Sequence, residues 1–202
     1  MEISSWEERY RSRERPREDF AVAPVPLVAE TAKHLPPGRA LDLACGTGRN
    51  ALWLAQHGWS VTAVDGAPTA IEIVRRRAGE GGLVVDARVA DLERGEYQIE
   101  SSAWDLICIC YYLQRDLFER AQRGLAPGGV LIAIVHIAGP GEPPTAHRLR
   151  PGELKAYFRG WEILHHYEGK PNDPAHQRLV AEIVARRSKD DAGDPVSAVH
   201  SP

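Results

Sequence analysis

A short glycine-containing loop between a predicted strand and a predicted helix constrains this chain most. The loop reads Asp42-Leu43-Ala44-Cys45-Gly46-Thr47-Gly48, and an apolar helical stretch at 50–57 follows it. Gly46 and Gly48 allow the backbone to turn sharply and to approach a ligand closely. The first N–H groups of the following helix lack intrahelical partners and can face that ligand. The loop therefore predicts a nucleotide-type ligand held between a strand end and a helix start.

Strand and helix patterns alternate along most of the chain. The predicted strands are 40–43, 60–64, 83–89, 104–110 and 130–135, and the predicted helices are 27–35, 50–57, 68–77 and 116–124. Such alternation is typical of parallel βα units that form one sheet with helices on both faces. We therefore expect an α/β domain built on a parallel sheet.

The C-terminal third breaks this alternation. A helix is predicted at 151–160, and two strands at 161–167 and 178–187 follow it with no helix between them. Adjacent strands that are joined without a crossover helix pair antiparallel. The sequence therefore predicts a parallel sheet that ends in an antiparallel hairpin at one edge.

Length and composition suit one soluble domain. The chain has 202 residues, of which 43% are apolar, and its net charge is −3. Residues 1–20 are expected to form an arm or lid, 21–187 the domain, and 188–202 a disordered tail. We find no broad basic field for nucleic acid, no apolar run that could span a bilayer, and no signal peptide in the charged N-terminus.

The three cysteines, Cys45, Cys108 and Cys110, are an odd number and lie in strand-like segments, which argues against a disulfide framework. We expect a cytoplasmic protein with reduced thiols. Its partner would be a small-molecule substrate, not nucleic acid or a membrane, and it would be a monomer or a homodimer.

Three aspartates at or near the ends of the first three predicted strands restrict the kind of ligand that this site can bind. Asp42 precedes the turn, where a carboxylate would repel phosphate and suit an ammonium group, or would pin the loop through backbone N–H bonds. Asp65 ends the second strand, where it would accept hydrogen bonds from ribose hydroxyls or act as a turn residue before Gly66. Asp91 follows the third strand, where it could hold an adenine amino group with Leu92 over the ring. S-adenosylmethionine has an amine, a cationic sulfur and no phosphate, and fits this arrangement.

These segments resemble the class I S-adenosylmethionine-dependent methyltransferases at 41–50, 63–65 and 90–92. From 6–10 to 184–187 the chain is also similar to the small bacterial tellurite-resistance-type methyltransferases. The resemblance implies a Rossmann-like, doubly wound, seven-stranded, mostly parallel sheet with an antiparallel C-terminal strand at the edge. It further implies that the N-terminal arm folds over the cofactor's amino-acid end, the alternative being a helix packed on the sheet.

The predicted cofactor site combines these arguments. It comprises Arg9, Tyr10, Asp42, Ala44, Cys45, Gly46, Gly48, Arg49, Asn50, Asp65, Gly66, Asp91, Leu92, Cys110 and Tyr111. The expected cofactor is S-adenosyl-L-methionine, which leaves as S-adenosyl-L-homocysteine. No metal is expected, because Cys108 and Cys110 alone lack the further ligands of a structural zinc site.

The acceptor side offers Tyr112, His136, His176 and Arg178 as candidates. Tyr112 would line the pocket or pack against a helix, and His136 would act as a base or be a structural strand-end residue. The resemblance implies a polar cluster near His176 and Arg178, which would suit an anionic acceptor, whereas a solvated edge arginine is the alternative. The loop 139–149 is a candidate substrate lid.

The expected function is methyl transfer from S-adenosylmethionine to a small molecule such as a thiol or a metalloid oxyanion like tellurite. The alternatives are a nicotinamide-dependent oxidoreductase and a non-catalytic cofactor-binding protein of the same fold. Asp42 and the lack of a Tyr-x-x-x-Lys pair argue against the oxidoreductase. No segment resembling Asn-Pro-Pro-Tyr follows the fourth strand, which argues against a methyltransferase that flips a base.

Overall fold

One seven-stranded sheet organises the chain. The computed structural model describes residues 3–12 and 22–190. The strands are β1 (Arg39–Leu43), β2 (Ser60–Asp65), β3 (Val85–Val89), β4 (Trp104–Cys110), β5 (Leu125–His136), β6 (Glu162–Gly169) and β7 (Val180–Arg186). The helices are α1 (Ile3–Arg11), α2 (Pro26–Ala32), α3 (Arg49–Gln56), α4 (Pro68–Glu80), α5 (Arg115–Gly124) and α6 (Glu153–Ala156).

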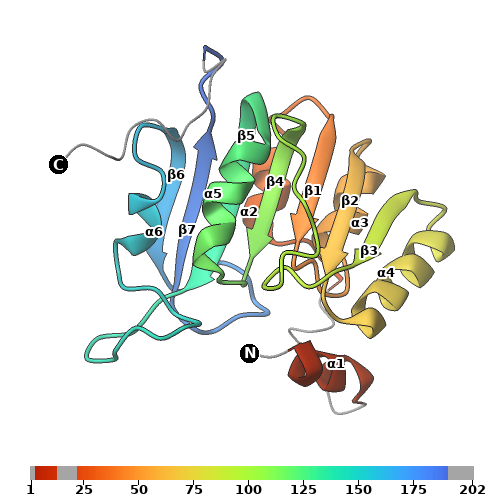
Figure 1. Cartoon of the computed structure of the whole chain (residues 1–202), viewed down its shortest axis with the longest axis horizontal. Coiled ribbons are helices and arrows are strands. Elements are labelled where there is room, and N and C mark those ends of the chain that lie inside the picture. The colour runs from red at the N-terminus through yellow and green to blue at the C-terminus, as the bar shows by residue number, and fades with distance from the viewer. Residues whose placement is uncertain (1–2, 13–21, 191–202) are drawn as a thin grey trace.

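Helices cover both faces of the sheet (Figure 1), and an apolar layer lies between the sheet and each set of helices. One layer packs α2, α3 and α4 against the sheet, and the other packs α5 and α6 against the opposite face. Strand β5 serves both layers, because Val130, Ile132 and Ile134 belong to the first and Leu131 and Ala133 to the second. Successive side chains of a strand point to opposite faces, so a strand buried on both faces is apolar throughout. This explains the continuous apolar run that the sequence shows there.

The strand order is β3-β2-β1-β4-β5-β7-β6. Strands β1 to β5 pair in parallel, and the order reverses direction between β1 and β4. In open α/β sheets, ligands bind at such a switch point, outside the carboxyl ends of the strands. The doubly wound, Rossmann-like prediction is confirmed, and the topology places a crevice directly above the loop that follows β1.

The antiparallel hairpin lies at one edge of the sheet, as predicted. Strand β7 pairs antiparallel with β5 on one side and with β6 on the other. The outermost strand is therefore β6, and the C-terminal strand β7 fits between it and β5. Because of this arrangement, the loop between β6 and β7 returns to the carboxyl ends of the parallel strands.

Several element boundaries differ from the sequence prediction. Strand β5 begins at Leu125 and includes the predicted turn at 127–129, since the N–H of Gly128 donates to the carbonyl of Arg187 over 3.1 Å. Helix α6 covers only Glu153–Ala156 of the predicted 151–160. Residues 90–103, all of which the structure describes, join β3 to β4 through turns and contain no helix. Across the described ranges, no helix has the length and apolarity needed to cross a membrane.

Candidate active site

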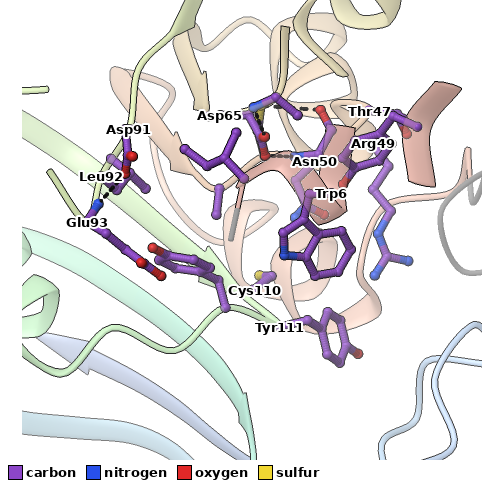
Figure 2. A pocket seen from close by; sticks show the side chains of 18 of the residues that line it. Trp6, Thr47, Arg49, Asn50, Asp65, Asp91, Leu92, Glu93, Cys110 and Tyr111 are labelled. Atoms are coloured by element: carbon purple, nitrogen blue, oxygen red, sulfur yellow. Dashed lines mark hydrogen bonds between the residues drawn. The ribbon is translucent and has the colours of Figure 1, made fainter. Parts of the chain in front are cut away.

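A cleft opens at the switch point, above the carboxyl ends of β1, β2 and β4 (Figure 2). It holds about 1010 Å³ of empty space, its open mouth included. Its walls are formed by Ile3, Trp6, Tyr10, Ala44, Cys45, Gly46, Thr47, Arg49, Asn50, Asp65, Gly66, Ala67, Asp91, Leu92, Glu93, Cys110, Tyr111, Tyr112 and His176. Most residues of the predicted cofactor site therefore surround one cavity, and the exceptions are Arg9, Asp42 and Gly48.

The two glycines of the loop have different tasks. Gly46 has a φ of 54°, and its N–H donates to Asp65 Oδ2 over 2.8 Å, so the loop is fastened to the end of β2. Gly48 has a φ of 81° and precedes the first residue of α3. A Cβ at Gly48 would lie 2.7 Å from Cγ2 of Val74 in α4, so this glycine permits close packing of the two helices. Gly46 lines the cleft and Gly48 does not, so cofactor contact by Gly48 remains a prediction.

Asp42 lies beneath the loop. Its residue is 1% exposed, and its carboxylate accepts a hydrogen bond from the N–H of Ala51 over 3.1 Å. Burial raises the pKa of Asp42 to about 7, although the Ala51 N–H works in the opposite direction. Direct contact with an ammonium group, one of the two interpretations of Asp42, does not fit this position. The other interpretation, that Asp42 pins the loop to the helix, is confirmed.

Asp65 links three segments of the site. Its Oδ2 accepts the Gly46 N–H, and its Oδ1 accepts the N–H of Ala67 over 2.9 Å. Burial raises the pKa of this carboxyl, and the hydrogen bonds from Ala67 and Gly46 lower it in part. Asp65 thus fixes the glycine loop and the entry to α4 while it faces the cleft. The interpretation of Asp65 as a turn residue fits its bond to Ala67, and its contact with ribose hydroxyls remains a prediction.

The turn after β3 is built by Asp91. Its Oδ1 accepts hydrogen bonds from the N–H groups of Glu93 and Arg94, over 2.9 and 3.1 Å. The N–H of Asp91 itself donates to the Glu96 carboxylate over 2.9 Å. Aspartate favours such turns because its short side chain reaches backbone donors two residues on. Asp91 and Leu92 thus line the far end of the cleft from a self-supporting turn.

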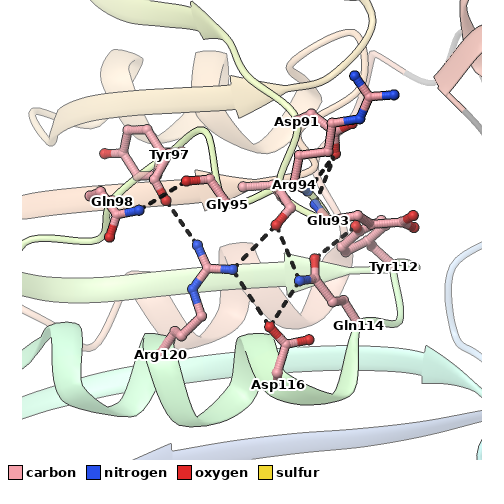
Figure 3. A network of polar contacts seen from close by, with 11 residues as sticks. Asp91, Glu93, Arg94, Gly95, Tyr97, Gln98, Tyr112, Gln114, Asp116 and Arg120 are labelled. Carbon is pink, nitrogen blue, oxygen red and sulfur yellow. Dashed lines mark hydrogen bonds and ion pairs between the residues drawn. The ribbon is translucent and has the colours of Figure 1, made fainter.

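Helix α5 holds that turn in place (Figure 3). The guanidinium of Arg120 donates to the carbonyls of Leu92 and Tyr97, over 3.2 and 2.8 Å. The side-chain amide of Gln114 also donates to the Leu92 carbonyl over 3.2 Å, and its oxygen accepts the hydroxyl of Tyr112 over 3.0 Å. The Leu92 end of the cleft is therefore fastened through backbone carbonyls to the segment that follows β4.

The N-terminal helix α1 covers part of the cleft. The Glu7 carboxylate accepts hydrogen bonds from the N–H and hydroxyl of Thr69, over 3.0 and 2.6 Å, which caps the start of α4. Trp6 and Tyr10 point into the cleft, while the Arg9 guanidinium lies 4.4 Å from the Trp6 ring centre and outside the cleft wall. Tyr10 therefore lines the cleft and Arg9 does not, and cofactor binding by either residue remains a prediction. The arm is a helix packed on α4 that also supplies cleft residues.

A buried polar cluster closes the opposite end. Asp173, in the loop between β6 and β7, accepts hydrogen bonds at Oδ2 from Arg49 over 2.6 Å and from the Tyr111 hydroxyl over 3.1 Å. Its Oδ1 accepts the N–H of Ala175 over 3.0 Å. His176 stacks on the Tyr111 ring at 3.4 Å between ring centres, with 8° between the planes. Arg49, Tyr111 and His176 line the cleft, and Asp173 stands behind them.

The candidates on the acceptor side divide in two. Tyr112 and His176 line the cleft, as predicted, and burial lowers the pKa of His176 to about 4. His136 lies behind them, its ring centre 6.0 Å from that of His176, and Arg178 is exposed. His136 and Arg178 do not contribute to the cleft wall, and neither do residues 139–149, so the roles predicted for them remain predictions.

Six residues of the site escaped the sequence prediction: Ile3, Trp6, Thr47, Ala67, Glu93 and Asp173. All six lie within three residues of a residue or segment that the prediction named, so a wider window around each would have included them. Asp173, three positions before His176, gave no sign of its contact with Arg49. It pairs with a residue 124 positions away in the sequence.

Comparison with known proteins places the chain in a family. The family described as tellurite resistance protein TehB matches residues 20–173. A probable S-adenosyl-L-methionine-dependent methyltransferase TehB of Haemophilus influenzae strain 10810 is 25% identical over 148 residues, which cover 70% of this chain and 52% of that protein. The chain spans about half the length of the curated TehB relatives it matches.

Solved structures share the fold. The crystal structure of TehB from Haemophilus influenzae has a TM-score of 0.69 and 24% identity, covering 80% of this chain and 61% of that one. The 1,6-didemethyltoxoflavin-N1-methyltransferase of Burkholderia thailandensis, with bound 1,6-didemethyltoxoflavin and S-adenosylhomocysteine, has a TM-score of 0.65 and 19% identity over 92% and 85% of the two chains. The chain therefore belongs to the tellurite resistance protein TehB family and has the fold of class I S-adenosylmethionine-dependent methyltransferases.

Proposed function

We propose that this protein is an S-adenosylmethionine-dependent methyltransferase that acts on a small molecule. The observation that carries the proposal is the single cleft at the switch point, in which Asp65, Asp91 and the glycine loop lie along one line of strand ends. Membership of the TehB family supports it. The donor set contains carboxylates and backbone groups for an amine, hydroxyls and an adenine, which suits a cofactor without phosphate.

The residues fit the cofactor from one end of the cleft to the other. Asp91 and Leu92 would hold the adenine, and Asp65 would face the ribose hydroxyls. The loop 44–49 and Arg49 would hold the amino-acid end. Cys110 and Tyr111, at the end of β4, would lie near the sulfonium, and the tyrosine ring would face its positive charge.

Bound cofactor supplies an activated methyl group. The acceptor would supply the lone pair for the new bond, and the cofactor's sulfur would keep the electron pair of the bond that it gives up. The protein's own task is to orient the acceptor and to exclude water, which Trp6, Tyr112 and His176 would do from three sides of the cleft. Because the pKa of His176 is about 4, its ring is neutral at pH 7. It would line the cleft and form hydrogen bonds without carrying a charge.

The proposed acceptor is a thiol or a metalloid oxyanion such as tellurite. A thiolate or an oxyanion carries its own nucleophilic lone pair, so the cleft need not contain a strong base. Burial raises the pKa of Tyr112, which keeps its hydroxyl protonated, and that hydroxyl would donate to such an acceptor in exchange for its hydrogen bond to Gln114.

Isothermal titration with S-adenosylmethionine and S-adenosylhomocysteine tests the cofactor, with NADH as the matched competitor from the oxidoreductase alternative. We expect micromolar binding of both sulfur compounds and none of NADH. Release of S-adenosylhomocysteine is then followed with tellurite, selenite and small thiols. Binding of NADH alone would overturn the proposal, and cofactor binding without turnover on any acceptor would favour the non-catalytic alternative.

A further inference from the structure

The buried carboxylate of Asp173 joins three segments that are distant in the sequence. It contacts Arg49 at the start of α3 and Tyr111 at the end of β4, and it lies itself in the loop between β6 and β7. The side chains of Asp173 and Arg49 are 4% and 12% exposed. A charge pair this far from water is held firmly only if further hydrogen bonds satisfy it, and Asp173 uses both oxygens in this way.

The same carboxylate shapes its own loop. Oδ1 accepts the N–H of Ala175, and the carbonyl of Asp173 accepts the N–H of His176 over 3.0 Å. This turn brings the His176 ring onto the Tyr111 ring. Burial works to raise the pKa of Asp173, but Arg49, Ala175 and Tyr111 outweigh it and lower the pKa, so the side chain is a carboxylate at neutral pH.

Tyr111 needs such support. Its backbone has a φ of 61°, which is costly for a residue with a side chain and persists only where the surroundings hold it. The N–H of Tyr111 donates to the Ile134 carbonyl over 2.6 Å, and its hydroxyl is held by Asp173. The ring is therefore fixed at both ends in the cleft wall.

We propose that Asp173 is a positioning residue that fixes the amino-acid end of the cofactor, acting through Arg49 and Tyr111. The inference rests on the proposed function, because it requires a cofactor with an amino-acid end. Asp173 does not itself line the cleft, whereas both of its partners do. The far end of the cleft, at Asp91 and Leu92, is instead fastened by Gln114 and by Arg120 of α5.

Binding of two related ligands distinguishes the two ends of the cleft. S-adenosylhomocysteine has the adenosine and the amino-acid end, and 5′-methylthioadenosine has the adenosine alone. Titration of the full chain with each is compared for the wild type and Asp173→Asn. We expect the dissociation constant for S-adenosylhomocysteine to rise about tenfold or more, because Arg49 loses its partner charge, and that for 5′-methylthioadenosine to stay within about twofold.

Glu182→Gln is the matched control. Glu182 is another buried carboxylate of the same hairpin, hydrogen-bonded to His165 over 3.1 Å and outside the cleft. We expect it to change neither constant. Equal weakening of both ligands in a folded Asp173→Asn, or no change in either constant, overturns the proposal.

Tyr111→Phe provides a second and milder variant. It removes one hydroxyl that donates to Asp173 and leaves the ion pair with Arg49 intact. We expect a rise of about threefold for S-adenosylhomocysteine alone. If Asp173→Asn does not fold, this variant decides, and equal effects on the two ligands contradict the proposal. A wild type that binds neither ligand would instead overturn the proposed function.

Discussion

The two ends of the cleft are built in different ways. At the Leu92 end, Asp91 bonds to residues two and three positions on, and the supporting ions are open to water, with Arg94 80% and Asp116 68% exposed. At the other end, Arg49 and Asp173 are distant in the sequence and almost fully buried. The first end is a local turn fastened from outside, and the second is a tertiary cluster.

The difference shows which interactions fix the positions of the side chains at each end. Exposed ion pairs contribute little, so the turn at Asp91 depends on hydrogen bonds to its own backbone and on the two carbonyls held by Arg120. A buried, paired carboxylate cannot lose one partner without leaving a desolvated charge. The amino-acid end of the proposed cofactor would thus be held by the buried cluster, in which the loss of a single partner has the larger effect.

The largest expected effect comes from a residue that supports both ends of the cleft, so both ligands should be affected alike. Asp65→Asn should weaken S-adenosylhomocysteine and 5′-methylthioadenosine equally, by about 100-fold, because an amide nitrogen would face a backbone N–H of Gly46 or Ala67. Titration calorimetry measures both. Asp86→Asn, an exposed carboxylate of β3 paired with Arg88, is the control and should leave both constants unchanged. Selective loss of only one ligand would contradict this central role.

An intermediate effect isolates the Leu92 end. Arg120→Met removes two hydrogen bonds to the carbonyls of Leu92 and Tyr97, and we expect both dissociation constants to rise by a similar factor of about five. In α5, Arg123→Met removes only an ion pair with Glu119 and should have no effect. The contrast with Asp173→Asn sharpens the comparison. If Arg120→Met weakened the binding of S-adenosylhomocysteine but not that of 5′-methylthioadenosine, the distinction between the two ends would be contradicted.

The smallest effect on binding is expected for Asp42, which lies buried beneath the glycine loop. Burial raises the pKa of Asp42 to about 7, above the value of about 3.9 expected in the unfolded chain. The stability that goes with its protonated form is therefore present at low pH and lost as the pH rises through 7. Asp42→Asn does not ionise and keeps an acceptor for the Ala51 N–H, so its stability relative to the wild type should increase from pH 5 to pH 8.

Urea unfolding at the two pH values measures this change, and binding of S-adenosylhomocysteine should shift by about twofold at most, because Asp42 lies outside the cleft. An equal stability difference at both pH values would show that Asp42 does not titrate in this range.

The fold and the central loop could be predicted because their signals are local. Glycines with positive φ, acids at strand ends and apolar runs of strand length each depend on a few neighbouring residues. The roles of Asp42 and Gly48 could not be resolved in this way. Both stand in the motif, but whether a motif residue faces the ligand or packs beneath it depends on the neighbouring helix, here Ala51 and Val74.

The sequence by itself determined the alternating order of strands and helices, the parallel sheet with its antiparallel hairpin, and the line of Asp65, Asp91 and the glycine loop. Only the tertiary structure decided that Asp173 meets Arg49 and Tyr111 and that His136 and Arg178 stay outside the cleft. The physical reason is the insertion of β7 between β5 and β6, which returns the hairpin loop to the switch point. Contacts between segments so distant in the chain leave no periodic or local pattern in the sequence.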